Sequence, residues 1–288
     1  MRKEDLIDQA IEYTRRNREN VIGETDALSV SSRGVKIFDD PLFAFADADD
    51  PLFFTLKEPR IIGGHYKLPK EWMAEAESVI SFFLPFSEII RSDNRRDNIW
   101  PSAGWLHGRF EGQAFINGLC VFLQGLLSSA GFDSRIPSME SCFQSKSGPG
   151  DLQDENRSLE NHLPFFTSNW SERHVAMVCG LGSFGLSKNF ITIKGAAGRF
   201  GSLVTDLKIE PNPDRFESFL SYCRSCGACI ERCPANAISF EHGKDHFVCS
   251  KFLDRIKDHF RPRHGCGKCQ VGVPCESSMP LIREDGLL

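Results

Sequence analysis

The sequence lacks the features that mark several protein classes. It has no strong excess of one charge: 34 basic and 39 acidic residues give a net charge of −5, which does not favour binding to duplex nucleic acid. Residues 1–20 hold no apolar core of the kind a signal peptide needs. The longest apolar run, Ser78 to Phe86, is about half of the roughly 20 residues that span a membrane. We therefore expect a cytoplasmic protein without a membrane segment.

Fixed-period repeats and low-complexity tracts are also absent. Hydrophobic residues make up 41% of the chain and charged residues 25%, which is ordinary for a globular protein and excludes disorder as the main state. Two segments are rich in polar or turn-forming residues, Gln144–His162 and Pro211–Asp214, and we interpret both as loops. Because the second precedes a cysteine-rich stretch, we expect domains at residues 1–210 and 211–288.

Hydrophobic periodicity indicates an α/β (α+β) fold. An amphipathic helix is expected over Glu4–Arg18, and a buried central strand over Val79–Leu84. Apolar residues from Phe115 to Leu127 keep a helical period, and Gly131 follows as a stop signal. Further strands are expected at 190–193 and 202–209. Strands interleaved with helices favour a layered sandwich over a helical bundle.

Cysteine is the abundant exception to this ordinary composition. The chain has eleven, of which eight lie between Cys223 and Cys275, whereas the first 222 residues contain only Cys120, Cys142 and Cys179. An odd and clustered set argues against a disulfide framework. We expect Cys120 and Cys179 to be core residues and the eight clustered cysteines to be metal ligands in a reducing compartment.

The spacing of the cluster points to iron. Cys223, Cys226, Cys229 and Cys233 followed by Pro234 form the C-x2-C-x2-C-x3-C-P run of bacterial ferredoxins. In that run three thiolates hold one 4Fe-4S cluster and the fourth serves another. A zinc knuckle is the alternative, but zinc sites usually pair two C-x2-C units at a distance.

A second set of cysteines completes the ligands for two clusters. Cys249 lies on an expected helix, Cys266 and Cys269 form another C-x2-C pair, and Cys275 follows Pro274. Two clusters in one small module favour an electron relay. The alternative is that the clusters only stabilise the fold, although one cluster would suffice for that.

The sequence resembles the epoxyqueuosine reductase family, and most closely a branch in anaerobes. The resemblance runs from about Ser78 through ESVISFFLPF, SERHVAMVCGLGSFGLSKNFIT, AGRFGSLVTDLKI and the cysteine module. It implies a nitroreductase-like core that binds cobalamin, followed by a ferredoxin-like domain with two 4Fe-4S clusters. Reductive dehalogenases share this plan, in which electrons pass through the clusters to cobalamin and then to an organic substrate.

The resemblance also sorts the ligands and exposes departures. It implies that Cys223, Cys226, Cys229 and Cys275 hold one cluster and that Cys233, Cys249, Cys266 and Cys269 hold the other. The spacing before Cys275 is two residues longer than in the family. At the position of the family's catalytic aspartate the alignment places Phe166, beside Thr167, and neither can act as a general acid near neutral pH. The chain is therefore not expected to reduce epoxyqueuosine in tRNA.

Candidate residues for the remaining chemistry come from the same segments. His174 and Glu172 are the candidate catalytic residues, because in the family this segment faces the cobalamin cavity and histidine titrates near neutral pH. A supporting role is the more common one for a lone histidine. Gly180, Gly182, Lys188 and Arg199 are the candidate cofactor contacts. Gly195–Gly201 resembles an anion-binding turn, or a tight turn before the next strand.

Two functional hypotheses follow. The chain is a reductase that passes electrons through two 4Fe-4S clusters to cobalamin in the α/β core for reduction of a small substrate. Alternatively, it is an electron-transfer protein that reduces the corrinoid or metal centre of another protein. Both need a low-potential donor such as ferredoxin or flavodoxin. A membrane or tRNA partner is not expected in either case.

The eight clustered cysteines predict the cluster count directly. Iron and sulfide analysis of anaerobically purified protein should give about eight of each per chain, because two cubane clusters contain four irons and four sulfides each. A value near four would show that one set of cysteines is structural or empty.

Overall fold

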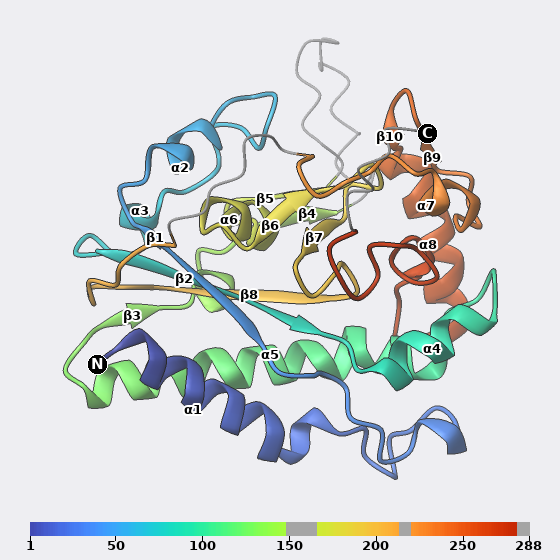
Figure 1. Ribbon diagram of the computed structural model, residues 1–288, viewed down its shortest axis with the longest axis horizontal. Helices are drawn as coiled ribbons and strands as arrows, with labels where there is room; N and C mark the ends of the chain where they lie inside the picture. The colour runs from blue at the N-terminus through green and yellow to red at the C-terminus, as the bar shows by residue number, and fades with distance from the viewer. Residues whose placement is uncertain (148–165, 213–219, 281–288) are drawn as a thin grey trace.

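The computed structural model describes residues 1–147, 166–212 and 220–280. At its centre is a four-stranded antiparallel sheet in the order β1-β2-β8-β3, which crosses the middle of Figure 1. Its strands are β1 (Leu42–Asp47), β2 (Ser78–Pro85), β8 (Gly198–Thr205) and β3 (Ser134–Arg135). All eight residues of β2 are buried, which confirms the central strand expected from the apolar run.

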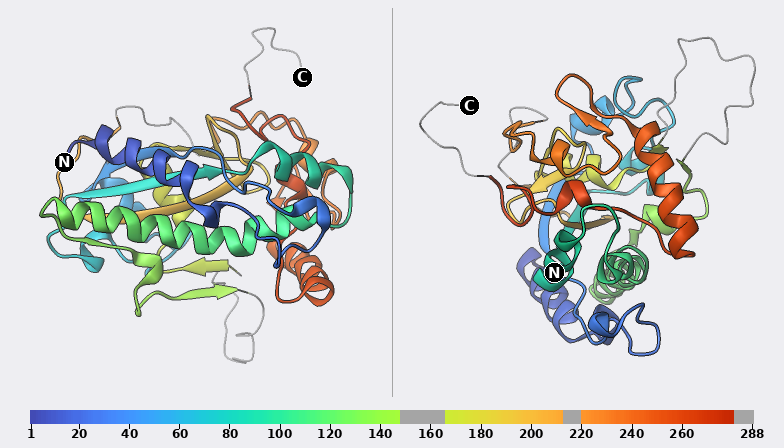
Figure 2. Two further views of the ribbon diagram at one scale, coloured as in Figure 1. Left: turned by 90° about the horizontal axis from the view of Figure 1, so that it is seen from below. Right: turned by 90° about the vertical axis from the view of Figure 1, so that its right-hand side faces the viewer.

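Helices cover one face of this sheet. The long helix α5 (Ala103–Ser129) packs on β8, and α1 (Lys3–Arg16) packs on α5; both lie in front of the sheet in the left view of Figure 2. The backbone N–H of Trp105 donates to the capping Ser102 Oγ at 3.2 Å, and Gly131, with φ +86°, follows the helix end. The helical period expected over 115–127 is confirmed, but the cap starts the helix earlier.

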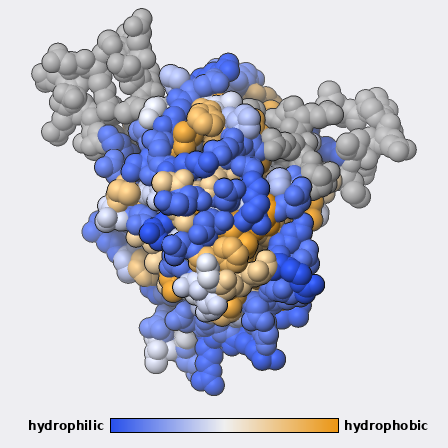
Figure 3. Space-filling view, turned by 90° about the vertical axis from the view of Figure 1, so that its left-hand side faces the viewer, coloured by the Kyte–Doolittle hydropathy of each residue, from blue (hydrophilic) through white to orange (hydrophobic). Residues whose placement is uncertain are grey.

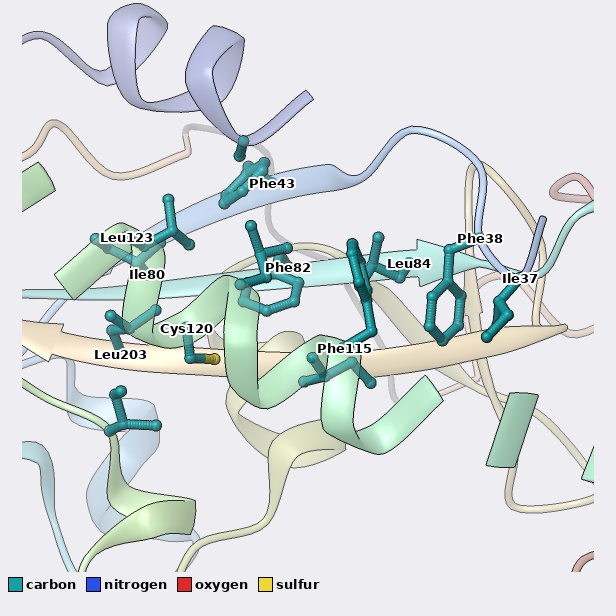
Figure 4. Packing of buried hydrophobic residues seen from close by; sticks show 14 of the residues in the cluster. Ile37, Phe38, Phe43, Ile80, Phe82, Leu84, Phe115, Cys120, Leu123 and Leu203 are labelled. Carbon is teal, nitrogen blue, oxygen red and sulfur yellow. The ribbon is translucent and has the colours of Figure 1, made fainter. Parts of the chain in front are cut away.

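The core on this face is built from apolar side chains of helix and sheet. Figure 4 shows Phe115, Cys120 and Leu123 of α5 facing Phe82 of β2 and Leu203 of β8. Each of these five side chains is at most 2% exposed. Burial of such side chains is the main stabilising contribution to a fold of this kind. Cys120 is thus a core residue, as expected, and so is Cys179 on the opposite face.

The opposite face of the sheet carries shorter elements. Helix α6 (Glu172–Val178) packs on β2 and β8, and α2 (Pro51–Thr55) packs on α6. The buried indole of Trp170 stacks on Tyr66 with 5.9 Å between ring centroids. The remaining elements here are α3 (Pro69–Trp72) and two hairpin-like pairs, β4 (Ser145–Ser147) with β5 (Phe166–Ser168), and β6 (Gly182–Phe184) with β7 (Phe190–Thr192).

Three sequence expectations need correction. The strand expected at 202–209 begins at Gly198 and ends at Thr205. The loop expected from Gln144 contains strand β4, and its residues 148–162 lie outside the described part of the chain. The expected anion-binding turn over Gly195–Gly201 is wrong, because residues 198–201 belong to a strand. In addition, the backbone N–H groups of Ala196 and Ala197 already donate to Cys275 and Glu276 carbonyl oxygens at 2.8 and 3.0 Å.

The cysteine-rich segment lies at one end of the sheet, on the right in Figure 1. It contains α7 (Ala228–Glu231), the pair β9 (Ile238–Ser239) and β10 (Gly243–Lys244), and α8 (His246–Phe260). Phe252 and Ile256 of α8 pack on Leu106 of α5, and α8 confirms the helix expected around Cys249. Core hydrogen bonds continue to Asn212, whose N–H donates to the Phe45 carbonyl at 3.0 Å; the division at residue 210 stays a prediction.

The last described stretch of the cysteine-rich segment runs back into the core. Lys268 is 0% exposed, and its Nζ donates to the Asn94 carbonyl at 2.7 Å. Glu276 is 5% exposed, and its carboxylate accepts from Arg95 Nε at 2.9 Å and from the Gly272 N–H at 2.7 Å. Charged side chains are buried in this way only when partners satisfy them. These contacts hold the cysteine-rich segment firmly on the core.

Figure 3 shows the end of the molecule remote from the cysteine-rich segment. Its visible surface is largely hydrophilic, with apolar residues in small groups. Within the described ranges, no helix combines the length and the apolar character needed to cross a membrane.

Two glycines in this returning stretch provide a matched test of the docking. Gly267 and Gly272 have nearly equal φ, +69° and +67°, so alanine at either costs about 1 kcal/mol of backbone strain. A Cβ on Gly267 would lie 2.0 Å from the Trp105 ring of the core, whereas at Gly272 the nearest atom is the flexible Arg232 Nε at 3.2 Å. Gly267→Ala should therefore lose about 1–3 kcal/mol more than Gly272→Ala.

Thermal unfolding of the two cluster-loaded variants measures this difference. A clearly lower midpoint for Gly267→Ala is expected, and iron content shows whether each variant kept its clusters. Equal midpoints would contradict close packing of the Gly267 backbone on Trp105.

Candidate iron-sulfur and reaction site

The first group of cysteines surrounds one cavity. Cys223, Cys226, Cys229 and Cys275 all line it, together with Gly185 and Leu186 of the core. Burial raises the pKa of the Cys275 thiol to about 12, and the neighbouring thiols of Cys223, Cys229 and Cys226 add to this shift. Cys275, which is distant in sequence from the other three, thus lies close to them in space.

Backbone geometry explains how the local motif turns its thiols inward. Gly227, with φ +77°, stands just before α7, which carries Cys229. The Cys223 sulfur accepts hydrogen bonds from the N–H of Ser225 at 3.5 Å and of Leu186 at 3.3 Å. Backbone N–H groups directed at a cluster thiolate tune the potential of an iron-sulfur centre.

The second group contains Cys233, Cys249, Cys266 and Cys269. Burial raises the pKa of Cys249, and the thiols of Cys269 and Cys233 contribute. Burial also raises the pKa of Cys266 to about 12, with contributions from Cys269 and Cys249. Cys249 is therefore near each of the other three members of the group. Across the residues described, no three His, Cys, Asp or Glu side chains gather tightly enough to hold a single metal ion.

The two groups of cysteines lie next to each other. Cys229 belongs to the first group, yet after burial the largest contribution to its raised pKa, about 11, comes from Cys269 of the second. Such adjacency is what two electron carriers in series require.

One loop of the core contacts both groups. Residues 185–189 connect β6 to β7, and we call them the 185–189 loop. The Leu186 N–H donates to Cys223 in the first group, and Asn189 Nδ2 donates to the Cys269 sulfur at 3.2 Å in the second. Lys244 Nζ donates to the same Cys269 sulfur at 3.5 Å. The core thus helps to position both groups.

The buried Lys268 fits an anionic centre at the second group. Among the described residues its ammonium donates to the carbonyl and side-chain oxygens of Asn94, at 2.7 and 3.2 Å, and both oxygens are neutral. A buried cation without a carboxylate partner is costly unless negative charge lies nearby. Cys266, two residues earlier, supplies such a charge when it is a thiolate. The residues present therefore suit a thiolate-ligated cluster.

The four predicted cofactor contacts have different surroundings. Gly180, with φ +85°, follows the end of α6. A Cβ on Gly182 would lie 1.9 Å from the Ile191 carbonyl oxygen. The local backbone thus explains why glycine occupies both positions. Lys188 also has positive φ, +54°, and its carbonyl accepts from Arg173 Nη1 at 3.2 Å. Arg199 donates to the Arg109 carbonyl and to Gln113 of α5. Their contact with a cofactor stays a prediction.

His174 has the weaker case of the two catalytic candidates. Burial, followed by the charge of Arg173, lowers the pKa of His174 to about 4, so the ring is neutral near pH 7. Its Nδ1 is hydrogen-bonded to Ser171 Oγ at 2.8 Å, and the ring packs on Phe184 with 4.9 Å between centroids. A neutral, tethered imidazole is a poor proton donor.

Glu172 has the properties of an acid that holds a proton. Burial raises its pKa to about 7, although the hydrogen bond from Ser202 opposes the shift. Trp170 Nε1 donates to Ser202 Oγ at 2.9 Å, and Ser202 Oγ donates to Glu172 Oε2 at 2.7 Å. This direction leaves Oε1, which is buried without a hydrogen-bond partner among the described residues, as the oxygen that carries the proton.

Several site residues were missed by sequence reasoning. Asn189 and Lys268 contact or adjoin the second cysteine group, and Arg109 and Arg173 lie beside Arg199. Arg173 and Asn189 lie in the SERHVAMVCGLGSFGLSKNFIT stretch that carries the resemblance but were given no role there, and no spacing or motif marks Arg109 or Lys268. Thr167, next to the position of the family's acid, is hydrogen-bonded through Oγ1 to His65 Nε2 at 2.6 Å. The side chain of Phe166 lies outside the described part, so the missing acid stays a prediction.

Comparisons with known proteins bear on this geometry. A model of the 4Fe-4S binding domain matches residues 219–239. The cysteine-rich segment is an iron-sulfur segment. The match to the 4Fe-4S model includes the C-x2-C-x2-C-x3-C run, and it therefore favours iron over zinc as the bound metal.

Two kinds of reductase are similar to parts of the chain. An epoxyqueuosine reductase of Staphylococcus aureus is 27% identical over 128 residues, covering 41% of this chain and 33% of that protein. A tetrachloroethene reductive dehalogenase of Desulfitobacterium hafniense is 38% identical over 68 residues, covering 23% of this chain and 12% of that protein. The aligned stretches thus span a third or less of these relatives.

The fold is also similar to that of solved structures. A selenomethionine-labelled epoxyqueuosine reductase gives a TM-score of 0.52 at 18% identity, covering 97% of this chain and 68% of that one. A second such reductase, with an epoxyqueuosine-modified tRNA stem loop, gives 0.52 at 18% identity, covering 97% and 67%. At this identity the likeness shows a shared mixed α/β fold that includes the iron-sulfur segment.

The raised pKa of Glu172 predicts a pH-dependent stability. An acid whose pKa rises from 4.5 to about 7 on folding keeps its proton more tightly in the folded state. Stability is therefore lost as pH rises from about 4.5 through 7. Glu172→Gln should be more stable than wild type at pH 8, by up to about 3 kcal/mol, and the advantage should shrink at pH 5.5.

Thermal unfolding at both pH values measures the effect, with exposed Glu75→Gln as the control that should show no such difference. A Glu172→Gln advantage that is the same at pH 5.5 and pH 8 would contradict the raised pKa.

Proposed function

We propose that this protein is an iron-sulfur reductase in which two 4Fe-4S clusters relay electrons to cobalamin at the 185–189 side of the core, for reduction of a small substrate. The observation that carries the proposal is that one core loop contacts both cysteine groups. A ferredoxin needs no such core. A core that contacts the ligands of both clusters would be placed to receive electrons from them.

The surface beside this loop fits a flat cofactor with polar edges. The Phe190 ring contacts Phe184 and Phe200 edge to face, with centroids 5.2 and 5.3 Å apart, and Phe184 and Phe200 are partly exposed. The first three residues of β8 are also partly exposed, unlike the rest of the strand. Apolar rings beside convergent polar groups are typical of cofactor sites.

Among the four predicted contacts, Lys188 is the side chain that would hold polar oxygens of the cofactor at this surface. Gly180 and Gly182 would contribute backbone only. When bound, cobalamin supplies the strongly reducing centre that acts on the substrate. Arg199 lies beside Arg109 and Arg173, and we do not assign it to cobalamin.

Glu172 has the role of proton holder in this proposal. Reduction of an organic substrate consumes protons as well as electrons, and a general acid works best with a pKa near the working pH. Glu172 meets this condition at about 7. Ser202, fixed by Trp170, keeps Oε2 occupied, so the proton resides on Oε1. In this proposal His174 does not donate a proton but helps to position Phe184 and Ser171.

Electrons would enter at the first cysteine group. Cys226 is exposed, unlike the other members of that group, so a low-potential protein donor such as ferredoxin or flavodoxin can approach its cluster. The second cluster, beside Asn189 and Lys244, would then be the one that delivers electrons to the reaction site. With Phe166 at the family's acid position, epoxyqueuosine in tRNA is not the proposed substrate.

The test is the visible spectrum of protein purified anaerobically from cells supplied with cobalamin. About one corrinoid per chain beside the broad cluster absorption supports the reductase. Cys275→Ser and Cys249→Ser should each lower iron to about four per chain while the corrinoid band persists. Cys142→Ser, an exposed cysteine outside both groups, should change neither.

Full cluster content without any corrinoid would refute the reductase in favour of the alternative, an electron-transfer protein that reduces a partner's centre. Unchanged iron in both ligand variants would refute the cluster assignment itself.

A further inference from the structure

Three arginines from three separate elements meet beside the partly exposed end of β8. Arg109 lies on α5, Arg173 on α6 and Arg199 on β8, and we call them the arginine cluster. Arg199 Nη1 donates to the Arg109 carbonyl oxygen at 3.3 Å. Burial lowers the pKa of Arg199 strongly, and the charges of Arg109 and Arg173 lower it further. Their guanidinium groups are therefore close enough to repel one another.

The arginine cluster has no counter-charge within the described residues. The acceptors of Arg199 are the Arg109 carbonyl and Gln113, and that of Arg173 is the Lys188 carbonyl, all neutral. Arg109 Nε is buried without any acceptor. By contrast, nearby Arg263 is paired with Glu111. The cluster is thus a concentration of positive charge with unused N–H donors.

Such an arrangement is costly unless an anion completes it. Like charges in a poorly hydrated region repel strongly, and a guanidinium has five N–H groups suited to bidentate contact with carboxylate or phosphate. All three side chains remain partly exposed, so a ligand can reach them. Arg173 Nη1 donates to the carbonyl of Lys188, and the next residue, Asn189, donates to the Cys269 sulfur, which puts the arginine cluster near the second cysteine group.

We propose that the arginine cluster binds the anionic group of the substrate, a carboxylate or phosphate on a small organic molecule, and holds that molecule beside the second iron-sulfur cluster. The reduction of that molecule rests on the proposed function, whereas the anion binding does not. Cobalamin also carries an oxyanion, but its phosphodiester has a single charge. Three guanidinium groups match a dianion or two carboxylates better.

The test uses inorganic phosphate as the probe and Arg109→Met as the variant, in cluster-loaded protein. Methionine keeps the aliphatic stem and removes a guanidinium whose Nε has no hydrogen-bond partner among the described residues. Wild type should bind phosphate in calorimetric titration and unfold at a higher temperature with it. The variant should bind at least about tenfold more weakly and, in phosphate-free buffer, unfold at a higher temperature than wild type.

Arg263→Met is the matched control, because it removes the same charge from an arginine that is already paired with Glu111. It should lose stability and keep its phosphate affinity. Arg199→Gln, which keeps a planar donor near Gln113, gives a second measurement if Arg109→Met folds poorly, and should also weaken phosphate binding. Absent phosphate binding in wild type, or equal losses in Arg109→Met and Arg263→Met, would overturn the proposal.

Cobalamin distinguishes the two sources of an oxyanion. Phosphate that still binds after cobalamin has been added supports a substrate subsite, and phosphate displaced by cobalamin overturns it. Iron analysis and the visible spectrum report on the clusters and the corrinoid separately. Phosphate binding without clusters or corrinoid would therefore refute the proposed function while leaving the anion site standing.

Discussion

Burial of two opposite charges in the stretch from Cys266 to Glu276 fixes the position of both cysteine groups. Lys268 donates to Asn94 and Glu276 accepts from Arg95, and neither charged residue is more than 5% exposed. Removing Asn94 or Arg95 would take a hydrogen-bond partner from a buried charge, which is strongly destabilising. Because Cys266, Cys269 and Cys275 lie within this stretch, their thiols are held against the core rather than on a loosely attached module.

Because the segment is attached in this way, residues of the core contact cysteines of both groups. The 185–189 loop directs a backbone N–H at Cys223 and an amide at Cys269. Helix α6 presents Glu172, which keeps a proton near neutral pH, and α5, α6 and β8 together contribute the arginine cluster, which has no counter-charge among the described residues. In the proposed function, electron supply, proton supply and charge recognition would be arranged around the region where the core and the cysteine-rich segment meet.

Local sequence signals predicted the parts of this arrangement that depend on local geometry. The C-x2-C-x2-C-x3-C-P run identified the iron-sulfur segment because the ligands of one cluster come largely from one turn. The apolar run at Val79–Leu84 identified the central strand because every side chain in it is buried. The glycines of β8 were misread as a turn. A Cβ at Gly198 would instead meet the Leu84 carbonyl at 2.3 Å, and one at Gly201 the Phe82 ring at 2.4 Å.

The arginine cluster and the docking contacts were not predictable in this way. Arg109, Arg173 and Arg199 come from a helix, a second helix and a strand, and only the tertiary fold brings them together. Lys268 resembles an ordinary surface lysine in sequence, and its burial depends on Asn94, which lies far from it in the chain. The choice of Glu172 over His174 also depended on environment, since burial moves their pKa values in opposite directions.

The central claim is that two adjacent 4Fe-4S clusters lie where the cysteine-rich segment meets the core. The most direct measurement is electron paramagnetic resonance of the protein reduced anaerobically with a strong reductant. Two adjacent paramagnetic clusters should give a spectrum broadened and split by magnetic coupling, and Cys275→Ser should reduce it to the simple signal of one isolated cluster. A simple single-cluster signal in wild type at full reduction would contradict the account.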